Sequence, residues 1–140
     1  MVERLRNSKA FIPELSLVAE LAGQIVGYIL LTKIEIKNEQ QVFKSLALAP
    51  VSVLPEFQNK GIGGTLILKA HEIAKSLGYE SVILLGHQDY YPKFGYVQTS
   101  QFGITLPFIV PTENCMAIEL ESNALISVTG VVDYPKEFSI

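Results

Sequence analysis

The sequence predicts a mixed α/β or α+β protein with a central β-sheet. Several short segments are continuously apolar or alternate between apolar and polar residues, which is typical of strands, and residues 63–77 have the period of a helix. A strand at 42–54, this helix and a strand at 81–85 follow one another, so we expect parallel pairing of the two strands through a right-handed crossover. The length of 140 residues predicts one domain, residues 1–140.

The N-terminal half is expected to form a hairpin. Residues 1–10 resemble the last part of a helix, and residues 15–21 alternate as in a strand. Ala22-Gly23-Gln24 predicts a tight turn into a second strand at 25–34, and the polar residues 35–41 predict a loop or a hairpin tip.

The third strand, residues 42–54, contains Pro50, which lacks an amide hydrogen. We therefore expect a break in its hydrogen-bond ladder near Ala49-Pro50-Val51. Backbone groups beyond the break could serve something other than a neighbouring strand, or the segment could be a simple edge strand. The pattern alone leaves both interpretations open.

The helix at 63–77 is amphipathic and is expected to stop at Gly78. Its apolar face would hold Leu66, Ile67, Ala70, Ile73, Ala74 and Leu77, and its polar side Lys69, Glu72 and Lys75. Beyond the strand at 81–85, residues 88–94 predict a short helix with Pro92 in its first turn. Residues 104–109, 115–120 and 128–132 predict further strands and loops.

Composition excludes several classes of protein. Hydrophobic residues make up 49% and charged residues 18%, which argues against disorder. No apolar stretch is long enough to span a bilayer and the start lacks the apolar run of a signal peptide, so we expect a cytoplasmic protein without membrane contact. The net charge of −3 and the lack of a dense Lys/Arg run argue against nucleic-acid binding. One cysteine and two histidines offer neither an internal disulfide nor metal-ligand spacing, so no metal is expected.

The segment before the long helix predicts an anion site. It reads Gln58-Asn59-Lys60-Gly61-Ile62-Gly63-Gly64. Glycines let the backbone approach a ligand, and a helix N-terminus presents unpaired N–H groups and a positive dipole. A pyrophosphate is the expected occupant, with Lys60 adding charge; a plain tight turn is the alternative. The P-loop and the dinucleotide fingerprint fit worse, because no Lys-Ser or Lys-Thr follows the glycines and Leu66 stands where a third glycine is needed.

A second segment, residues 87–96, contains Tyr90 and Tyr91 after the strand at 81–85. Such tyrosines could supply a phenol to a site, or they could only pack a short helix against the sheet.

Together the two segments resemble GNAT N-acetyltransferases. Gln58-x-x-Gly61-x-Gly63 is similar to the family's Gln/Arg-x-x-Gly-x-Gly/Ala signature, and Tyr90-Tyr91-Pro92-Lys93-Phe94-Gly95-Tyr96 is similar to its Phe/Tyr-Tyr-x-x-x-Gly-Phe/Tyr segment. Residues 48–57 also look like the family, and a bacterial subgroup of uncharacterised predicted acetyltransferases is the nearest likeness. The resemblance covers nearly the whole chain and implies a GNAT-like central mixed β-sheet flanked by helices.

The resemblance also implies an activity, the transfer of an acetyl group from acetyl-CoA to an amine of a small molecule or protein by direct attack. The backbone of Val51, Ser52 and Val53 would pair with the pantetheine arm of the cofactor, and Tyr91 would protonate the departing thiolate. The pyrophosphate would lie against Gln58, Asn59, Lys60, Gly61, Ile62, Gly63, Gly64 and Thr65. The general base stays open among Glu56, His87 and Asp89.

The sequence departs from the family pattern at its start, where we expect the N-terminal strand and first helix to be missing. An exposed sheet edge there leads us to expect a homodimer. A non-catalytic CoA-binding sensor or interaction module is the alternative function; the missing elements and the lack of an obvious base favour it, whereas Tyr91 favours the enzyme. Residues 34–41 and 102–112 are expected to form loops near the acceptor site.

Overall fold

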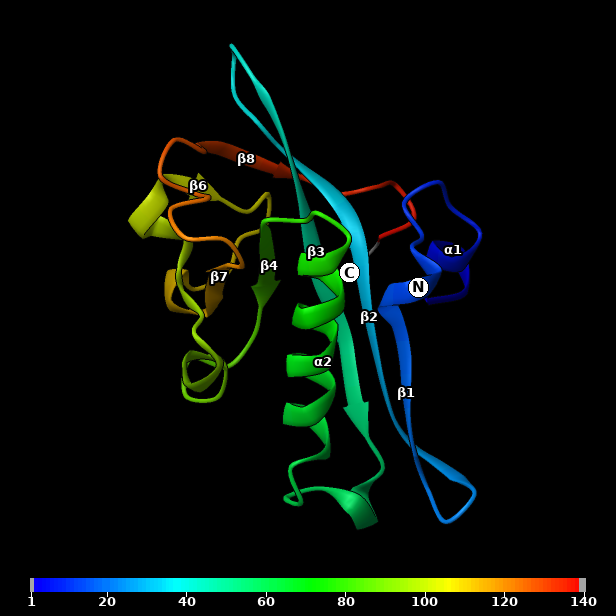
Figure 1. Ribbon diagram of the computed structural model, residues 1–140. Helices are drawn as coiled ribbons and strands as arrows, with labels where there is room; N and C mark the ends of the chain where they lie inside the picture. The colour runs from blue at the N-terminus through cyan, green and yellow to red at the C-terminus, as the bar shows by residue number, and fades with distance from the viewer. Residues whose placement is uncertain (1, 139–140) are drawn as a thin grey trace.

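The computed structural model describes residues 2–138 and contains a mixed sheet with one long helix, α2, packed on it (Figure 1). The sheet order is β5-β7-β4-β3-β2-β8-β6, with β1 paired to β2. The elements are α1 (Val2–Arg6), β1 (Ser16–Leu21), β2 (Gln24–Lys37), β3 (Val42–Val53), α2 (Ile62–Ser76), β4 (Ser81–Leu85), β5 (Val97–Gln98), β6 (Ile104–Thr105), β7 (Cys115–Glu119) and β8 (Gly130–Asp133). Short 3₁₀ turns are η1 (Pro13–Leu15), η2 (Pro55–Phe57), η3 (Tyr91–Phe94), η4 (Thr99–Phe102) and η5 (Thr112–Asn114).

The N-terminal hairpin is confirmed, with one correction to its second strand. Ala22 and Gly23 both have positive φ, as a type I′ hairpin turn requires, and β1 pairs with β2 in antiparallel fashion. The prediction of a loop from residue 35 is wrong, because β2 continues to Lys37. Ile36 is fully buried and pairs with Phe43, so packing extends this strand beyond its polar neighbours. The tip is held by the Asn38 side chain, whose Oδ1 accepts the N–H groups of Gln40 and Gln41.

The expected break in β3 is present. Ile29 pairs with Val51 and Leu31 with Leu48, so Ala49 and Pro50 both lie opposite Leu30 in a bulge. The Ala49–Pro50 peptide bond is cis.

β3 and β4 run parallel, as predicted, but only over a short distance. Their paired positions are Leu46 with Val82 and Ala47 with Ile83. One residue earlier the two strands are joined by buried hydroxyls, since Ser45 Oγ lies 2.7 Å from Ser81 Oγ. Beyond Ala47 the strands part, and the rest of β3 has no described neighbour on the side of β4.

Helix α2 follows the prediction within one residue at each end. Leu66, Ile67, Ala70 and Ala74 are buried against the sheet. Its C-terminus is closed by Gly78 at φ +93°, with the Gly78 N–H donating to Lys75 O and the Tyr79 N–H to Ala74 O. These two bonds form a Schellman motif.

The sheet is buried on both faces. Leu46, Val82 and Met116 pack under α2, whereas their neighbours Ala47, Ile83 and Ala117 join a second cluster beneath the C-terminal segment. Because successive side chains of a strand point to opposite faces, a sheet covered twice needs continuously apolar strands. This explains the unbroken apolar sequence of β4.

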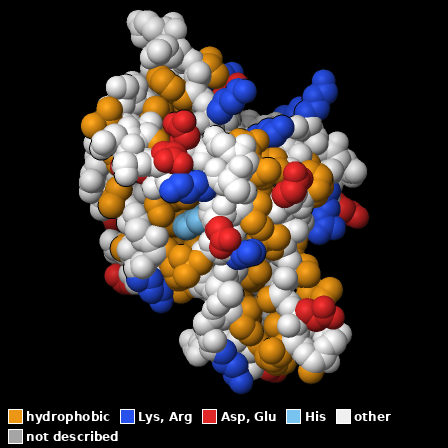
Figure 2. Space-filling view, in the orientation of Figure 1, with side chains coloured by type: hydrophobic (Ala, Val, Ile, Leu, Met, Phe, Trp, Pro, Cys, Tyr) orange, Lys and Arg blue, Asp and Glu red, His pale blue; other side chains and the backbone are white. Residues whose placement is uncertain are grey.

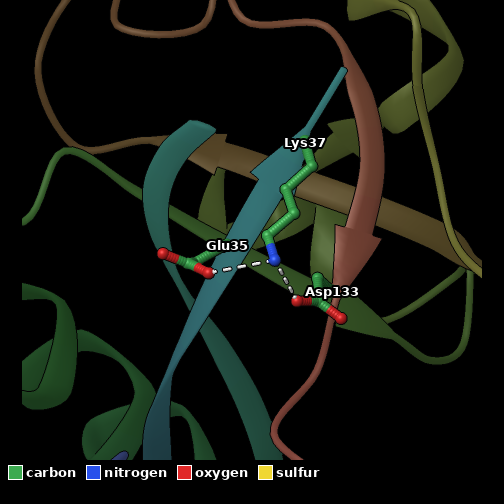
Figure 3. Close-up of polar contacts among 3 residues, drawn as sticks. All are labelled: Glu35, Lys37 and Asp133. Carbon is green, nitrogen blue, oxygen red and sulfur yellow. Dashed lines mark ion pairs between the residues drawn. The ribbon is translucent and has the colours of Figure 1, made fainter. Parts of the chain in front are cut away.

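The C-terminal segment is tied to the far end of β2. Residues 104–109 and 128–132 form only the short strands β6 and β8, and β8 pairs with β2 at Glu35–Lys37. Lys37 Nζ lies 2.8 Å from Asp133 Oδ2 and 3.5 Å from Glu35 Oε1 (Figure 3). The hydrogen bond and charge of Asp133 raise the pKa of Lys37. The ion pair between Lys37 and Asp133 therefore links β2 to β8, two strands that are distant in sequence.

Candidate functional site

A cleft of about 980 Å³ lies where β3 leaves β4. One wall is the end of β3 and the loop leading into α2, and the other is the segment after β4 that contains η3. In the space-filling view the outline of the molecule is indented beside this end of α2 (Figure 2). Its described lining residues are Val51, Ser52, Val53, Phe57, Gln58, Asn59, Gly61, Ile62, Gly63, Gly64, His87, Tyr90, Tyr91, Lys93 and Phe94.

The N-terminus of α2 opens into this cleft. The first helical hydrogen bond runs from the Thr65 N–H to Gly61 O, so the N–H groups of Ile62, Gly63 and Gly64 have no carbonyl within the helix to bind. Gly61 has φ +81° and Asn59 has φ +64°. These two residues adopt the left-handed backbone conformation and turn the chain into the helix. Such a terminus attracts an anion through its N–H groups and its dipole.

Glycine at positions 63 and 64 allows the two walls to approach each other. A Cβ at Gly63 would lie 3.2 Å from Tyr90 Oη, and a Cβ at Gly64 would lie 3.2 Å from the Phe94 ring. Larger residues would therefore push η3 away from α2. The two glycines therefore permit this close approach and also lie at the open N-terminus of α2.

The exposed end of β3 offers backbone donors to the cleft. The Leu54 N–H donates to Val26 O in β2, 2.8 Å away. Because N–H groups alternate sides along a strand, those of Val53 and Val51 point away from β2, toward the side that β4 has left. The Gln58 side chain donates to Val53 O at 3.0 Å and so holds the loop against the strand.

Tyr91 is half-buried in the opposite wall. Its ring lies edge-on to the rings of Tyr90 and Tyr96, with centroids 5.0 and 5.9 Å away. A Cβ at Gly86 would collide with the Tyr91 ring, so glycine is required where the chain leaves β4. Burial, with a smaller effect of Tyr90, raises the pKa of the Tyr91 phenol above its ordinary value. The phenol therefore keeps its proton at neutral pH and can donate it.

The aromatic wall is anchored to α2 by a buried polar pair. His71 Nε2 lies 2.8 Å from Tyr96 Oη, and Tyr96 is almost fully buried. Burial lowers the pKa of His71 to about 4, so this imidazole is neutral at pH 7. The pair connects α2 to the segment that carries Tyr91.

The structure brings most of the predicted site residues to one cleft. Tyr91 faces the same cavity as nine of the predicted cofactor residues, namely Val51, Ser52, Val53, Gln58, Asn59, Gly61, Ile62, Gly63 and Gly64. Lys60 and Thr65 are exposed and are not part of the lining, and the Thr65 hydroxyl donates to Gly61 O.

Among the candidate bases, His87 lines the cleft, whereas Glu56 and Asp89 do not. The loop expected at residues 34–41 is placed at the opposite end of β3, as the cyan tip and the green turn before α2 in Figure 1 show. It therefore does not wall this cleft, and residues 102–112 are not part of the lining either.

Sequence patterns did not single out Phe57, Lys93 and Phe94, which also line the cleft. The clue for the last two was their position two and three residues after Tyr91 in the aromatic segment. In the described part of the chain, no cluster of three His, Cys, Asp or Glu side chains could hold a metal ion, and no helix there is long and apolar enough to cross a membrane.

Comparison with known sequences identifies close similarity to acetyltransferases. The family described as acetyltransferase (GNAT) domain matches residues 13–98, which include both segments of the cleft. The chain is 33% identical over 133 residues to the uncharacterized N-acetyltransferase YjhQ of Escherichia coli K12, covering 93% of this chain and 74% of YjhQ. It is 26% identical over 118 residues to the uncharacterized N-acetyltransferase YhbS of the same strain, covering 84% and 69% of the two chains.

Solved structures give the same picture of the fold. A GNAT acetyltransferase of Brucella melitensis, in complex with acetyl-CoA, superposes with a TM-score of 0.76 at 30% identity, covering 99% of this chain and 75% of its own. YhbS of E. coli, in complex with CoA, superposes with a TM-score of 0.89 at 23% identity, covering 97% and 74%. The expected mixed sheet with flanking helices is therefore confirmed.

Proposed function

This chain belongs to the GNAT family of acetyltransferases, and on that premise we propose which of its residues bind acetyl-CoA and carry the transfer. The protein is an N-acetyltransferase that uses acetyl-CoA as co-substrate and an amine as acceptor. The observation that supports the proposed site most strongly is the cleft where β3 parts from β4, with a helix N-terminus on one wall and Tyr91 on the other.

The residues of the cleft fit the cofactor. Its pyrophosphate would lie on the N–H groups of Ile62, Gly63 and Gly64, where the helix dipole favours negative charge. The backbone of Val51, Ser52 and Val53 would bind the pantetheine arm, since its outward groups have no strand partner. Gln58, Asn59 and Gly61 would shape the loop, while Lys60 and Thr65, at its outer surface, would contribute only from the rim.

When bound, acetyl-CoA supplies a thioester carbonyl and a thiolate leaving group. We propose that the N–H groups of Val51 and Val53 stabilise negative charge that develops on the carbonyl oxygen. The Tyr91 phenol donates its proton to the departing sulfur, because its raised pKa keeps it protonated until then. The deprotonated acceptor amine attacks directly.

His87 is the proposed general base, since it alone of the three candidates reaches the cleft. It would accept a proton from the incoming amine, which must lose its charge before it attacks. Small-molecule amines and protein amines are both tested as acceptors below.

We further propose a cytoplasmic homodimer without affinity for nucleic acid. The net charge of −3 opposes binding to phosphate backbones. Among the described strands β1 pairs only with β2, so its outer edge is open to a second copy. The molar mass in solution tests the dimer, and a monomer at all concentrations would contradict it.

The first experiment is calorimetric titration with acetyl-CoA, CoA and ATP, followed by a screen of amines for thiol release. We expect saturable binding of acetyl-CoA and CoA, weak or no binding of ATP, and turnover with at least one amine. Binding without turnover by any small or protein amine would favour the non-catalytic CoA-binding module. No binding of acetyl-CoA would contradict the proposed site.

A further inference from the structure

The cleft contains one formally charged side chain that no part of the proposed mechanism uses. Among the described residues that line it, Lys93 is the only lysine, arginine, aspartate or glutamate. A positive charge in a cleft without opposing carboxylates attracts anions, because nothing nearby neutralises it. Lys93 lies on η3, across the cleft from the N-terminus of α2.

The position of the ammonium group is set by aromatic rings. Lys93 Nζ lies 4.3 Å from the centroid of the Tyr90 ring and 5.7 Å from that of Phe94. Within residues 2–138, no carboxylate is within ion-pair distance of Lys93. The cation is therefore held by ring faces, which leaves its three N–H donors available to a ligand.

The same two rings touch the glycine turn of α2. Tyr90 Oη lies 3.2 Å from where a Cβ of Gly63 would be, and the Phe94 ring lies equally close to that of Gly64. The ammonium group is thus next to the rings that abut the helix N-terminus. A phosphate group on the helix and the Lys93 cation would share the same part of the cleft.

We propose that Lys93 is a cofactor-binding residue whose ammonium group pairs with a phosphate of CoA. This inference rests on the proposed function and assigns to Lys93 the cationic role that the sequence suggested for Lys60. Both lysines are exposed, but Lys93 lines the cleft and Lys60 does not. The pyrophosphate and the 3′-phosphate of CoA are both anionic phosphate groups that an ammonium group can bind. The experiment below distinguishes which of them pairs with Lys93.

The test compares CoA and dephospho-CoA, which lacks the 3′-phosphate, in calorimetric titrations of Lys93→Gln, Lys60→Gln and Lys69→Gln. Lys69→Gln is the matched control, because it removes one exposed lysine charge from the outer face of α2. We expect Lys93→Gln to raise the Kd of CoA about 5-fold, which corresponds to about 1 kcal/mol, and to weaken its dependence on salt. An equal loss for both ligands would assign the pyrophosphate, and a loss for CoA alone would assign the 3′-phosphate.

Three results would overturn the inference while leaving the proposed function intact. The Kd of CoA could be the same in Lys93→Gln and the wild type, Lys69→Gln could lose as much affinity as Lys93→Gln, or Lys60→Gln could lose affinity in its place. Equal thermal unfolding of the variants excludes misfolding as the cause. Failure of the wild type to bind CoA would instead contradict the proposed function itself.

Discussion

At the scale of single residues, the cleft depends on small side chains that make room for large ones. Gly63, Gly64 and Gly86 each lie where a Cβ would meet an aromatic side chain of the segment 90–94, the hydroxyl of Tyr90 in the case of Gly63. The motif Gln58-x-x-Gly61-x-Gly63 is therefore more than a flexible loop. Gly61 provides the positive φ of the turn, whereas Gly63 lets Tyr90 approach the helix.

The proposed role of Tyr91 leads to a prediction about turnover. Tyr91→Phe removes the donating hydroxyl and retains the ring that packs on Tyr90 and Tyr96. We expect kcat to fall about 100-fold with CoA affinity nearly unchanged, as loss of a general acid implies. Steady-state thiol release, with an amine from the acceptor screen, measures this.

Tyr79→Phe is the matched control, since Tyr79 lies beyond the other end of α2, outside the cleft lining. Unchanged turnover in Tyr91→Phe would remove the proposed acid. A parallel loss of CoA binding would mean that the hydroxyl acts in binding.

At the scale of secondary-structure elements, the sequence predicts helices and strands that have local signals. It misses element boundaries that depend on pairing with a distant strand. The helix, its glycine stop and strand β4 were placed within one residue, because period and capping are encoded locally. The end of β2 was missed because pairing with β3 and β8 extends it. In the same way, motifs predicted the glycine loop and Tyr91, but only the fold could show that Lys93 lines the cleft and Lys60 does not.

The stop of α2 gives a prediction about stability. Gly78 adopts φ +93° and a Cβ there would meet no atom within 4 Å, so Gly78→Ala introduces backbone strain without a steric clash. We expect a loss of about 1 kcal/mol in the free energy of unfolding. Urea unfolding measures it, and Gly78→Asn should recover part of the loss because Asn tolerates this conformation. An alanine variant as stable as the wild type would show that the motif contributes nothing.

At the scale of the whole molecule, the sheet is enclosed by α2 on one face and the C-terminal segment on the other. Two buried polar pairs join elements that are distant in sequence: Ser45 with Ser81, between β3 and β4 of the sheet, and His71 with Tyr96, between α2 and the residue before β5. The sequence did not suggest either pair. Such pairs are recognised only when the fold brings distant residues together, and each affects the stability of the entire chain.

His71 predicts a loss of global stability in acid. Its pKa is about 4 in the folded protein and near 6.5 when unfolded, so the unfolded chain binds the proton first as pH falls. The free energy of unfolding should therefore decrease between pH 6.5 and pH 4 by about 2–3 kcal/mol from this group.

Urea unfolding of the wild type and His71→Gln at several pH values tests this, because glutamine can still bind Tyr96 but does not titrate. The variant should lose less stability over this range. Equal losses in the two proteins would show that other groups cause the acid sensitivity.

Strand β3 joins the two ends of the proposed reaction site. The half of β3 that pairs with β4 ends at Ala47, and the half without a partner on that side ends at Val53, close to the loop proposed to bind the phosphates. These residues lie opposite Thr32 and Gly27 of β2, five positions apart, so they are about 16 Å apart, because the bulge at Ala49 and Pro50 shortens the span. Under the proposed function, the length of this strand sets the distance between the site that binds the phosphates and the site where the acyl group is transferred. Acceptor specificity could then change in evolution through the loops, while the acyl group would come to rest at the same depth in every related enzyme that keeps the strand.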